Sequence, residues 1–206
     1  MINWISYFRS DFLLSINSVI VGCLLRMRGV RVGKGFKARA MPLVIMDETS
    51  SIIIGNNVFF KDRVELRSLK GSKLVLEDET KLDRDVRIVV TNSSTFKLGK
   101  AGDVGCYTIF NCGADVSIGS NILIAGFCYI QTSNHEVQRH MPINEQGYVH
   151  KTINLGTDCW LGGGAFILPG AELGDGVVVG ANSVVNKKFR QYKIVAGSPA
   201  KEIGSR

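Results

Sequence analysis

The chain has 206 residues, of which 45% are hydrophobic and 21% are charged, and its formal net charge is +7. This length and this ordinary globular composition exclude a disordered or collagen-like chain, and they fit one domain with enough residues for a real core. Glycine is the outlier, because 23 glycines against only 4 prolines indicate many tight backbone turns.

The positive charge is concentrated at the N-terminus. Residues 1–40 hold one acidic side chain, Asp11, and seven basic ones, which are Arg9, Arg26, Arg28, Arg31, Lys34, Lys37 and Arg39. The rest of the chain is nearly neutral and has no basic stripe interleaved with base-reading side chains, so we expect no nucleic-acid partner. The five cysteines contain no CxxC pair. This argues against a disulfide framework or a thiolate zinc site and fits a cytoplasmic protein.

Residues 1–29 are expected to form an N-terminal helical arm. One or two short helices are predicted before Val32 by the rough helical spacing of Trp4, Tyr7, Phe8, Phe12 and Leu13. Residues 12–25 form an uncharged apolar run that is too short to span a bilayer, and basic residues follow at once, so we expect neither a membrane span nor a cleaved signal peptide. Two interpretations stay open: a cap on the following domain, or peripheral contact with the inner face of a membrane.

A six-residue repeat organises the chain from Ile54 onward. Its first position is apolar, its second is often glycine, and its fifth is small or β-branched. The first positions are Ile54, Phe60, Leu76, Leu82, Leu98, Val104, Phe110, Ile118, Ile124, Ile130, Leu155, Leu161, Ile167, Leu173, Val179 and Val185. This pattern predicts a short strand on each side of a triangular coil, with glycine where the backbone must turn. Equivalent positions recur every 18 to 22 residues, which predicts that extra residues enter once per coil at one corner.

This repeat resembles that of the hexapeptide-repeat acyltransferases, which fold as left-handed parallel β-helices. The resemblance covers about residues 30–203 and implies an all-β fold, with the β-helix domain at residues 30–190 and a C-terminal tail at 191–206. Stacked coils bury a continuous apolar column, so both ends of the stack need covers. The resemblance also implies a homotrimer whose active site lies between neighbouring subunits.

The repeat breaks in a loop excursion at about residues 131–152, which contains all three histidines. His135 is still in register with the preceding coil, so we expect the strand ladder of the coil to hold its backbone, whereas His140 and His150 are expected to be exposed loop residues. The segment TSNH resembles the catalytic segment of maltose, galactoside and xenobiotic O-acetyltransferases, which implies that His135 is a general base. An imidazole with a pKa near ~6.5 can accept the proton of a sugar hydroxyl. Asn111 resembles the asparagine that faces the acceptor in these enzymes.

The C-terminal coils carry the most specific pattern. Residues 155–189 read LGTDCWLGGGAFILPGAELGDGVVVGANSVVNKKF and are followed by VAGSPAKEI, which resembles the acetyl-CoA-binding coils of the family. The resemblance implies that Trp160 borders the pantetheine arm and that backbone groups of Gly163 and Ala181 bind its amides. The adenosine phosphates are expected to face Asn186, Lys187, Lys201 and Arg206, because an anion needs cations at its end.

Together these features predict an acetyl-CoA-dependent O-acetyltransferase that transfers acetyl directly to a saccharide hydroxyl. The expected acceptor is a precursor of a surface polysaccharide, O-antigen or capsule. We expect no metal cofactor. Amino-sugar N-acetyltransferase and xenobiotic acetyltransferase activity remain alternatives within the same fold. Two further alternatives are a zinc-dependent carbonic-anhydrase-like protein, in which His135 and His140 would have ligand spacing, and a non-catalytic trimeric scaffold.

Overall fold

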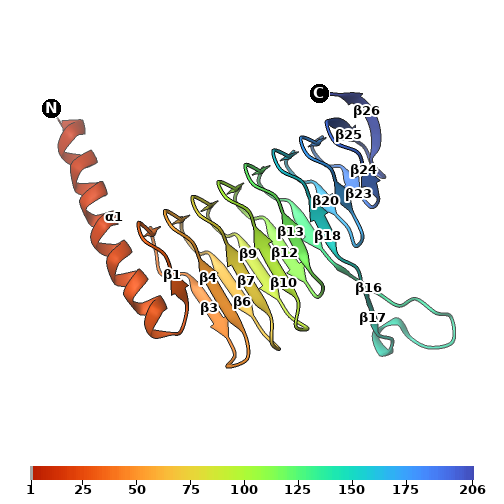
Figure 1. Cartoon of the computed structure of the whole chain (residues 1–206), viewed down its shortest axis with the longest axis horizontal. Helices are drawn as coiled ribbons and strands as arrows, with labels where there is room; N and C mark the ends of the chain where they lie inside the picture. The colour runs from red at the N-terminus through yellow and green to blue at the C-terminus, as the bar shows by residue number, and fades with distance from the viewer. Residues whose placement is uncertain (1) are drawn as a thin grey trace.

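The computed structural model describes residues 2–206, with side chains from Leu13 onward. It consists of one helix followed by a stack of parallel β coils, from which one hairpin protrudes (Figure 1). No helix in the described chain reaches the length and apolar character that crossing a bilayer requires.

The helix α1 (Ile2–Met27) is continuous, in place of the one or two short helices that were predicted. It lies across the first end of the coil stack (Figure 1) and buries Val21 and Leu25 there. Asn17 Nδ2 donates a hydrogen bond to the Ala38 carbonyl at 2.8 Å, and the Ala38 N–H donates one to Ser18 Oγ at 3.0 Å. The helix therefore covers the apolar end of the first coil. The side chains of Trp4, Tyr7, Phe8 and Phe12 lie outside the described residues.

Three parallel sheets form the three sides of the coil. Sheet A contains β1 (Arg31–Val32), β4 (Ser51–Ile54), β7 (Lys73–Leu76), β10 (Thr95–Leu98), β13 (Val116–Ile118), β18 (Ile153–Leu155), β21 (Glu172–Leu173) and β24 (Lys188–Phe189). Sheet B contains β2 (Lys37–Ala38), β5 (Phe59–Phe60), β8 (Lys81–Leu82), β11 (Asp103–Val104), β14 (Leu123–Ile124), β19 (Trp160–Leu161), β22 (Val178–Val179) and β25 (Lys193–Ala196). The strand β26 (Lys201–Ser205) ends sheet B by pairing antiparallel with β25.

Sheet C contains β3 (Leu43–Met46), β6 (Glu65–Ser68), β9 (Arg87–Val90), β12 (Ile109–Cys112), β15 (Tyr129–Gln131), β20 (Phe166–Ile167) and β23 (Val184–Val185). The protruding hairpin consists of β16 (Ser133–His135) and β17 (Tyr148–His150), with a short 3-10 helix η1 (Ile143–Glu145) in its loop. We call the corner at which the chain passes from sheet B to sheet C the B–C corner, and the corner from sheet C to sheet A the C–A corner.

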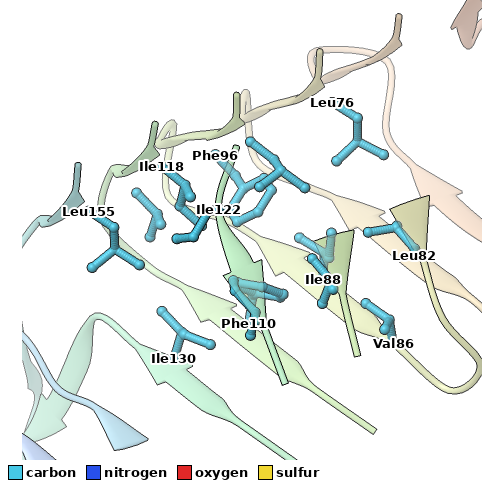
Figure 2. Close-up of a cluster of buried hydrophobic side chains, with 14 of the residues drawn as sticks. Leu76, Leu82, Val86, Ile88, Phe96, Phe110, Ile118, Ile122, Ile130 and Leu155 are labelled. Atoms are coloured by element: carbon cyan, nitrogen blue, oxygen red, sulfur yellow. The ribbon is translucent and has the colours of Figure 1, made fainter. Parts of the chain in front are cut away.

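The repeat predicted the core correctly. All sixteen first-position residues are buried, with exposed fractions no higher than the 4% of Leu155 and Leu173. Figure 2 shows side chains of sheet A facing those of sheet C across the interior, with Leu76, Ile118 and Leu155 opposite Ile88, Phe110 and Ile130. Two cysteines fill the column of small inward residues, and burial raises the pKa of the Cys128 and Cys159 thiols. These thiols are packing groups.

Extra residues enter at the C–A corner, once per coil, as predicted. Six residues separate Phe60 from Leu66, but ten separate Leu66 from Leu76, and strands β4 and β6 are four residues long in these wide coils. In the last coils, six residues separate Ile167 from Leu173, and β20, β21, β23 and β24 are two residues long. The stack is therefore wider at its N-terminal end and narrower where the C-terminal coils lie.

The glycine column of the repeat has a different cause from the predicted one. None of the eight second-position glycines has a φ in the left-handed region, and corner residues such as Asn57 (φ 55°) and Asp85 (φ 58°) make the turns instead. A Cβ on Gly119 would lie 2.5 Å from Thr157 N and 2.6 Å from the carbonyl carbon of Gly156, both in the next coil. The prediction of a turning role was wrong, since these glycines are required by the close stacking of the coils.

Candidate active site

The loop excursion folds into the antiparallel hairpin β16–β17, which leaves the stack at the C–A corner (Figure 1). Ser133 pairs with His150, and His135 pairs with Tyr148. The coil strand β15 ends earlier, at Gln131. The prediction that the strand ladder of the coil holds the backbone of His135 was therefore wrong, because the hairpin holds it instead.

The hairpin is anchored at its root by Thr132. This side chain is fully buried, and its Oγ1 accepts hydrogen bonds from the N–H groups of Gly113 at 2.8 Å and Ala114 at 3.0 Å in the preceding coil. The Lys151 N–H donates to the Thr132 carbonyl at 2.9 Å and so closes the base of the hairpin. The position of the hairpin is consequently fixed by the rigid coil beneath it.

One face of the hairpin carries two histidines and the tyrosine between them. Because side chains alternate across a strand, Ser133, His135, Tyr148 and His150 share this face. The ring centroids of His135 and Tyr148 are 4.3 Å apart, and those of Tyr148 and His150 are 6.0 Å apart. Ser133 Oγ and His150 Nδ1 are hydrogen bonded at 2.7 Å. His140 lies in the exposed loop, as expected, and His150 is exposed but makes these specific contacts.

A cleft of about 440 Å³ lies between this face and the C–A corner. Its lining consists of Lys70, Val89, Thr91, Asn92, Asn111, Cys112, Gly113, Ser133, Tyr148 and His150. The predicted acceptor residue Asn111 is among them, and its Nδ2 donates a hydrogen bond of 2.6 Å to Tyr129 Oη. His135 is connected to the cleft through its ring contact with Tyr148. The cleft thus offers hydroxyls, amides, a phenol ring, an imidazole and the Lys70 cation, a set suited to a polar ligand such as a sugar.

Asn111 is the one cleft residue that the sequence analysis assigned to the site, and the residues that it missed include Lys70, Asn92, Tyr148 and His150. The first two carried a usable signal, because Lys70 and Asn92 are 22 residues apart and Gly113 follows 21 residues later at the same corner. The 20- to 22-residue coil spacing therefore superimposes them. Tyr148 and His150 carried no such signal, since the pairing of the hairpin follows no repeat.

The predicted donor residues begin at the B–C corner. Trp160 lies in β19 and is 49% exposed, so its indole is available to a ligand. Gly163 and Ala181 occupy this corner in consecutive coils, where the Asn182 N–H donates to the Gly163 carbonyl at 2.9 Å. A Cβ on Gly162 would lie 2.6 Å from Ala181 N. Glycines 162–164 leave the backbone bare at this corner, which is what close approach of an extended ligand requires.

The predicted phosphate-binding residues lie at three corners of the stack. Lys201 pairs with Ala196 at the end of β25, next to the B–C corner, and is exposed. Arg206 forms an ion pair with Asp158 at 2.8 Å, two residues before Trp160. Asn186 and Lys187 are exposed at the C–A corner, after β23. The structure therefore places Lys201 and Arg206 on the same side as Trp160, but it does not bring Asn186 and Lys187 there.

Within the part of the chain that the structure describes, no group of three histidine, cysteine, aspartate or glutamate side chains is arranged to hold a metal ion. His135 and His140 therefore have no third ligand of these types among the described residues.

A family model named bacterial transferase hexapeptide (six repeats) matches residues 152–187. Two curated relatives carry provisional names. Acetyltransferase Rv3034c of Mycobacterium tuberculosis is 29% identical over 178 residues, which cover 86% of this chain and 50% of the relative. Colanic acid biosynthesis acetyltransferase WcaF of Escherichia coli (strain K12) is 34% identical over 105 residues, which cover 50% of this chain and 53% of the relative. The chain spans about half the length of these relatives.

Among solved structures, a galactoside acetyltransferase in complex with coenzyme A superimposes with a TM-score of 0.58 at 25% identity, covering 63% of this chain and 64% of that chain. These similarities confirm the resemblance to hexapeptide-repeat acyltransferases, and the coil stack has their left-handed parallel β-helix fold.

Proposed function

We propose, from the similarity of its coils to hexapeptide-repeat acyltransferases, that this protein is an acetyl-CoA-dependent O-acetyltransferase that acts on a saccharide hydroxyl. The observation that carries the proposal is the polar cleft beside the two-histidine face of the hairpin, in a stack similar to a galactoside acetyltransferase solved with coenzyme A. The name of one relative refers to colanic acid biosynthesis, which favours a surface-polysaccharide precursor as acceptor and a cytoplasmic location for the reaction.

In this proposal His135 is the general base. Its neutral imidazole takes the proton of the acceptor hydroxyl while the hydroxyl oxygen attacks the thioester carbonyl. The tetrahedral intermediate then loses the thiolate, and the imidazolium returns the proton to the sulfur. The Tyr148 ring packs against the His135 ring, with their centroids 4.3 Å apart, and holds it in place. The His150 ring packs on Tyr148 in turn, and its hydrogen bond with Ser133 fixes its position. Asn111 is proposed to face the acceptor in the cleft.

The donor is proposed to lie along the B–C corner. Trp160 would border the pantetheine arm, whose amides would meet the bare backbone at Gly163 and Ala181. Lys201 lies next to this corner, whereas Arg206 lies at the opposite edge of sheet B, beside Asp158. Both would face the phosphates together with the more distant Asn186 and Lys187. The chemistry fits, because backbone groups suit an uncharged amide chain and cations suit its phosphate end.

A homotrimer is supported by the two-corner arrangement. His135 and Asn111 lie at the C–A corner, whereas Trp160 lies at the B–C corner, on the far edge of sheet C. A neighbouring subunit can place its C–A corner against the B–C corner of this one and so complete the site. The B–C corner also exposes Leu123, Phe127, Trp160 and Phe166, whose apolar surface is suited to a subunit contact.

The test combines binding and turnover. Melting temperature is measured across an acetyl-CoA titration, in which a ligand that binds the folded state raises stability as RT ln(1 + [L]/Kd). Thiol release is then measured with mono- and oligosaccharide acceptors for wild type and His135→Ala. We expect saturable stabilisation in both proteins and a loss of turnover of about 10²- to 10⁴-fold in the variant. An unshifted melting temperature at millimolar acetyl-CoA would refute the donor, and undiminished turnover in His135→Ala would refute the base.

A further inference from the structure

The helix α1 is apolar on two opposite sides. One side carries Ser18, Val21 and Leu25, all of which are buried against the first coil. The other side carries six apolar side chains that are between 42% and 83% exposed: Leu13, Ile16, Val19, Ile20, Leu24 and Met27. At about 100° per residue these six occupy a sector of about 140°, centred nearly opposite the buried side. The packed helix therefore presents a second, uncovered apolar stripe, which we call the outward stripe.

An apolar stripe of this extent is unusual on a surface that faces water alone. Helices that are apolar all round are normally covered on all sides. Asn17 donates a hydrogen bond to Ala38 and Ser18 accepts one from it, which holds α1 on the first coil, so the helix cannot turn to hide the outward stripe. The outward stripe is therefore suited to contact with an external partner.

The charges that follow the stripe identify the chemistry of this partner. Between Asp11 and Asp47 the chain has no acidic residue and six basic ones, which are Arg26, Arg28, Arg31, Lys34, Lys37 and Arg39. All six are exposed, and none of them takes part in an ion pair of the described chain. The Arg26 guanidinium donates to the Val32 carbonyl at 2.9 Å and so ties the end of the helix to the coil. A second copy of the stripe would bring the same positive charge and be repelled, whereas an anionic surface would be attracted.

We propose that the outward stripe and these basic residues bind the surface of an anionic lipid bilayer. The helix lies flat in the headgroup region, with its apolar side chains toward the acyl chains and the cations among the lipid phosphates. Because α1 lies across the end of the stack (Figure 1), the coils stand on the membrane with the C-terminal coils away from it. This contact goes beyond the proposed reaction and does not depend on it.

Flotation of the full-length protein with vesicles tests the proposal. Vesicles of phosphatidylcholine with 30% phosphatidylglycerol are compared with pure phosphatidylcholine at low and at 0.5 M salt. We expect binding to the anionic vesicles that weakens with salt, and a loss of about fivefold for each of Arg28→Gln and Arg31→Gln. Val19→Glu should lower the partition coefficient at least about tenfold. The matched control is Ile203→Glu, because Ile203 is equally exposed, at 67%, in the terminal strand β26 at the other end of the stack.

Three results would overturn the proposal: absence of vesicle binding, equal binding to neutral and anionic vesicles, or equal losses in Val19→Glu and Ile203→Glu. Size-exclusion chromatography with light scattering is run on the same variants. If Val19→Glu changes the oligomeric state while vesicle binding is preserved, the stripe is a contact between copies of this chain and the lipid assignment is wrong. Acetyl transfer by the unbound protein is not needed for any of these readouts.

Discussion

Replacing Gly119 with alanine should destabilise the coil stack, although the change adds only one methyl group. The new Cβ would lie 2.5 Å from Thr157 N and 2.6 Å from the carbonyl carbon of Gly156, both backbone atoms of the next coil. Carbon atoms make their best contacts at about 3.5–4.0 Å, so the two coils would have to separate locally by about 1 Å. The hydrogen bond from the Gly119 N–H to the Leu155 carbonyl, 2.8 Å long, spans the same gap and would be strained.

The expected magnitude follows from the cost of overpacking, which is about 1–3 kcal/mol in well-packed interiors. For a domain of this size, each kcal/mol lowers the melting temperature by about 2–4 °C, so we expect a decrease of about 2–12 °C. Thermal unfolding followed by circular dichroism measures the shift. Urea unfolding of the same variant should show a lower midpoint with an unchanged slope, because the surface exposed on unfolding is the same.

The matched control is Gly147→Ala in the hairpin loop. There the nearest atom to a new Cβ is Glu136 Oε1, at 3.9 Å, so the methyl group has room and the melting temperature should stay that of the wild type. If Gly119→Ala had the same melting temperature as Gly147→Ala, close stacking of the coils would be refuted as the reason for the glycine column.

Three further predictions concern the candidate site and Asp47, which lies at the first C–A corner. Gly113→Ala would place a Cβ 2.7 Å from Ser133 Oγ and 2.8 Å from His150 Nδ1. Both are side-chain atoms that can move, so stability should be kept while kcat/KM for the acceptor falls at least about tenfold in a thiol-release assay. Trp160→Ala should leave the melting temperature unchanged and raise the Kd of acetyl-CoA about tenfold in calorimetry, since the indole is half exposed; an unchanged Kd would remove Trp160 from the donor site. Hydrogen bonds, chiefly from the Ser50 side chain, lower the pKa of Asp47 from its ordinary 3.8 to about 2. Asp47→Asn should therefore destabilise at neutral pH, and its difference from wild type should shrink as the pH falls from about 4 toward 2, where the wild-type carboxylate is protonated. A constant difference in melting temperature across that range would contradict this.

The fold could be predicted because the repeat, although it is read from six residues at a time, determines which residues stack on one another across the whole chain. Each hexad places one large side chain inward, so reading Ile54, Leu76 and Leu98 as equivalent positions already defined one side of the stack, and they are stacked in sheet A. The spacing of 22 residues in the wide coils and 18 in the narrow ones likewise indicated that extra residues enter at one corner of each coil. The reason for the glycines could not be found in this way, since it depends on the distance between coils.

The candidate site was predicted only in part. The excursion was recognised by the loss of the repeat, and Asn111 by its motif, and both belong to one cleft. The pairing of His135 with Tyr148, and the contact of His150 with Ser133, depend on a hairpin register that turns 12 residues of loop back onto the coil. Antiparallel pairing of this kind leaves no period in the sequence, so His150 looked like an ordinary loop histidine.

The regular spacing of the parallel coils sets distances along the stack. Four strand steps separate β2, against which α1 packs, from β14 in the coil that leads into the hairpin. At about 4.8 Å per step, this sets a height of about 19 Å between the helix-bearing end and the level of the hairpin. Removing one complete 22-residue coil would preserve every inward position and lower that height by one step, whereas removing part of a strand would break the register. The number of coils thus sets the distance between the helix-bearing end and the hairpin.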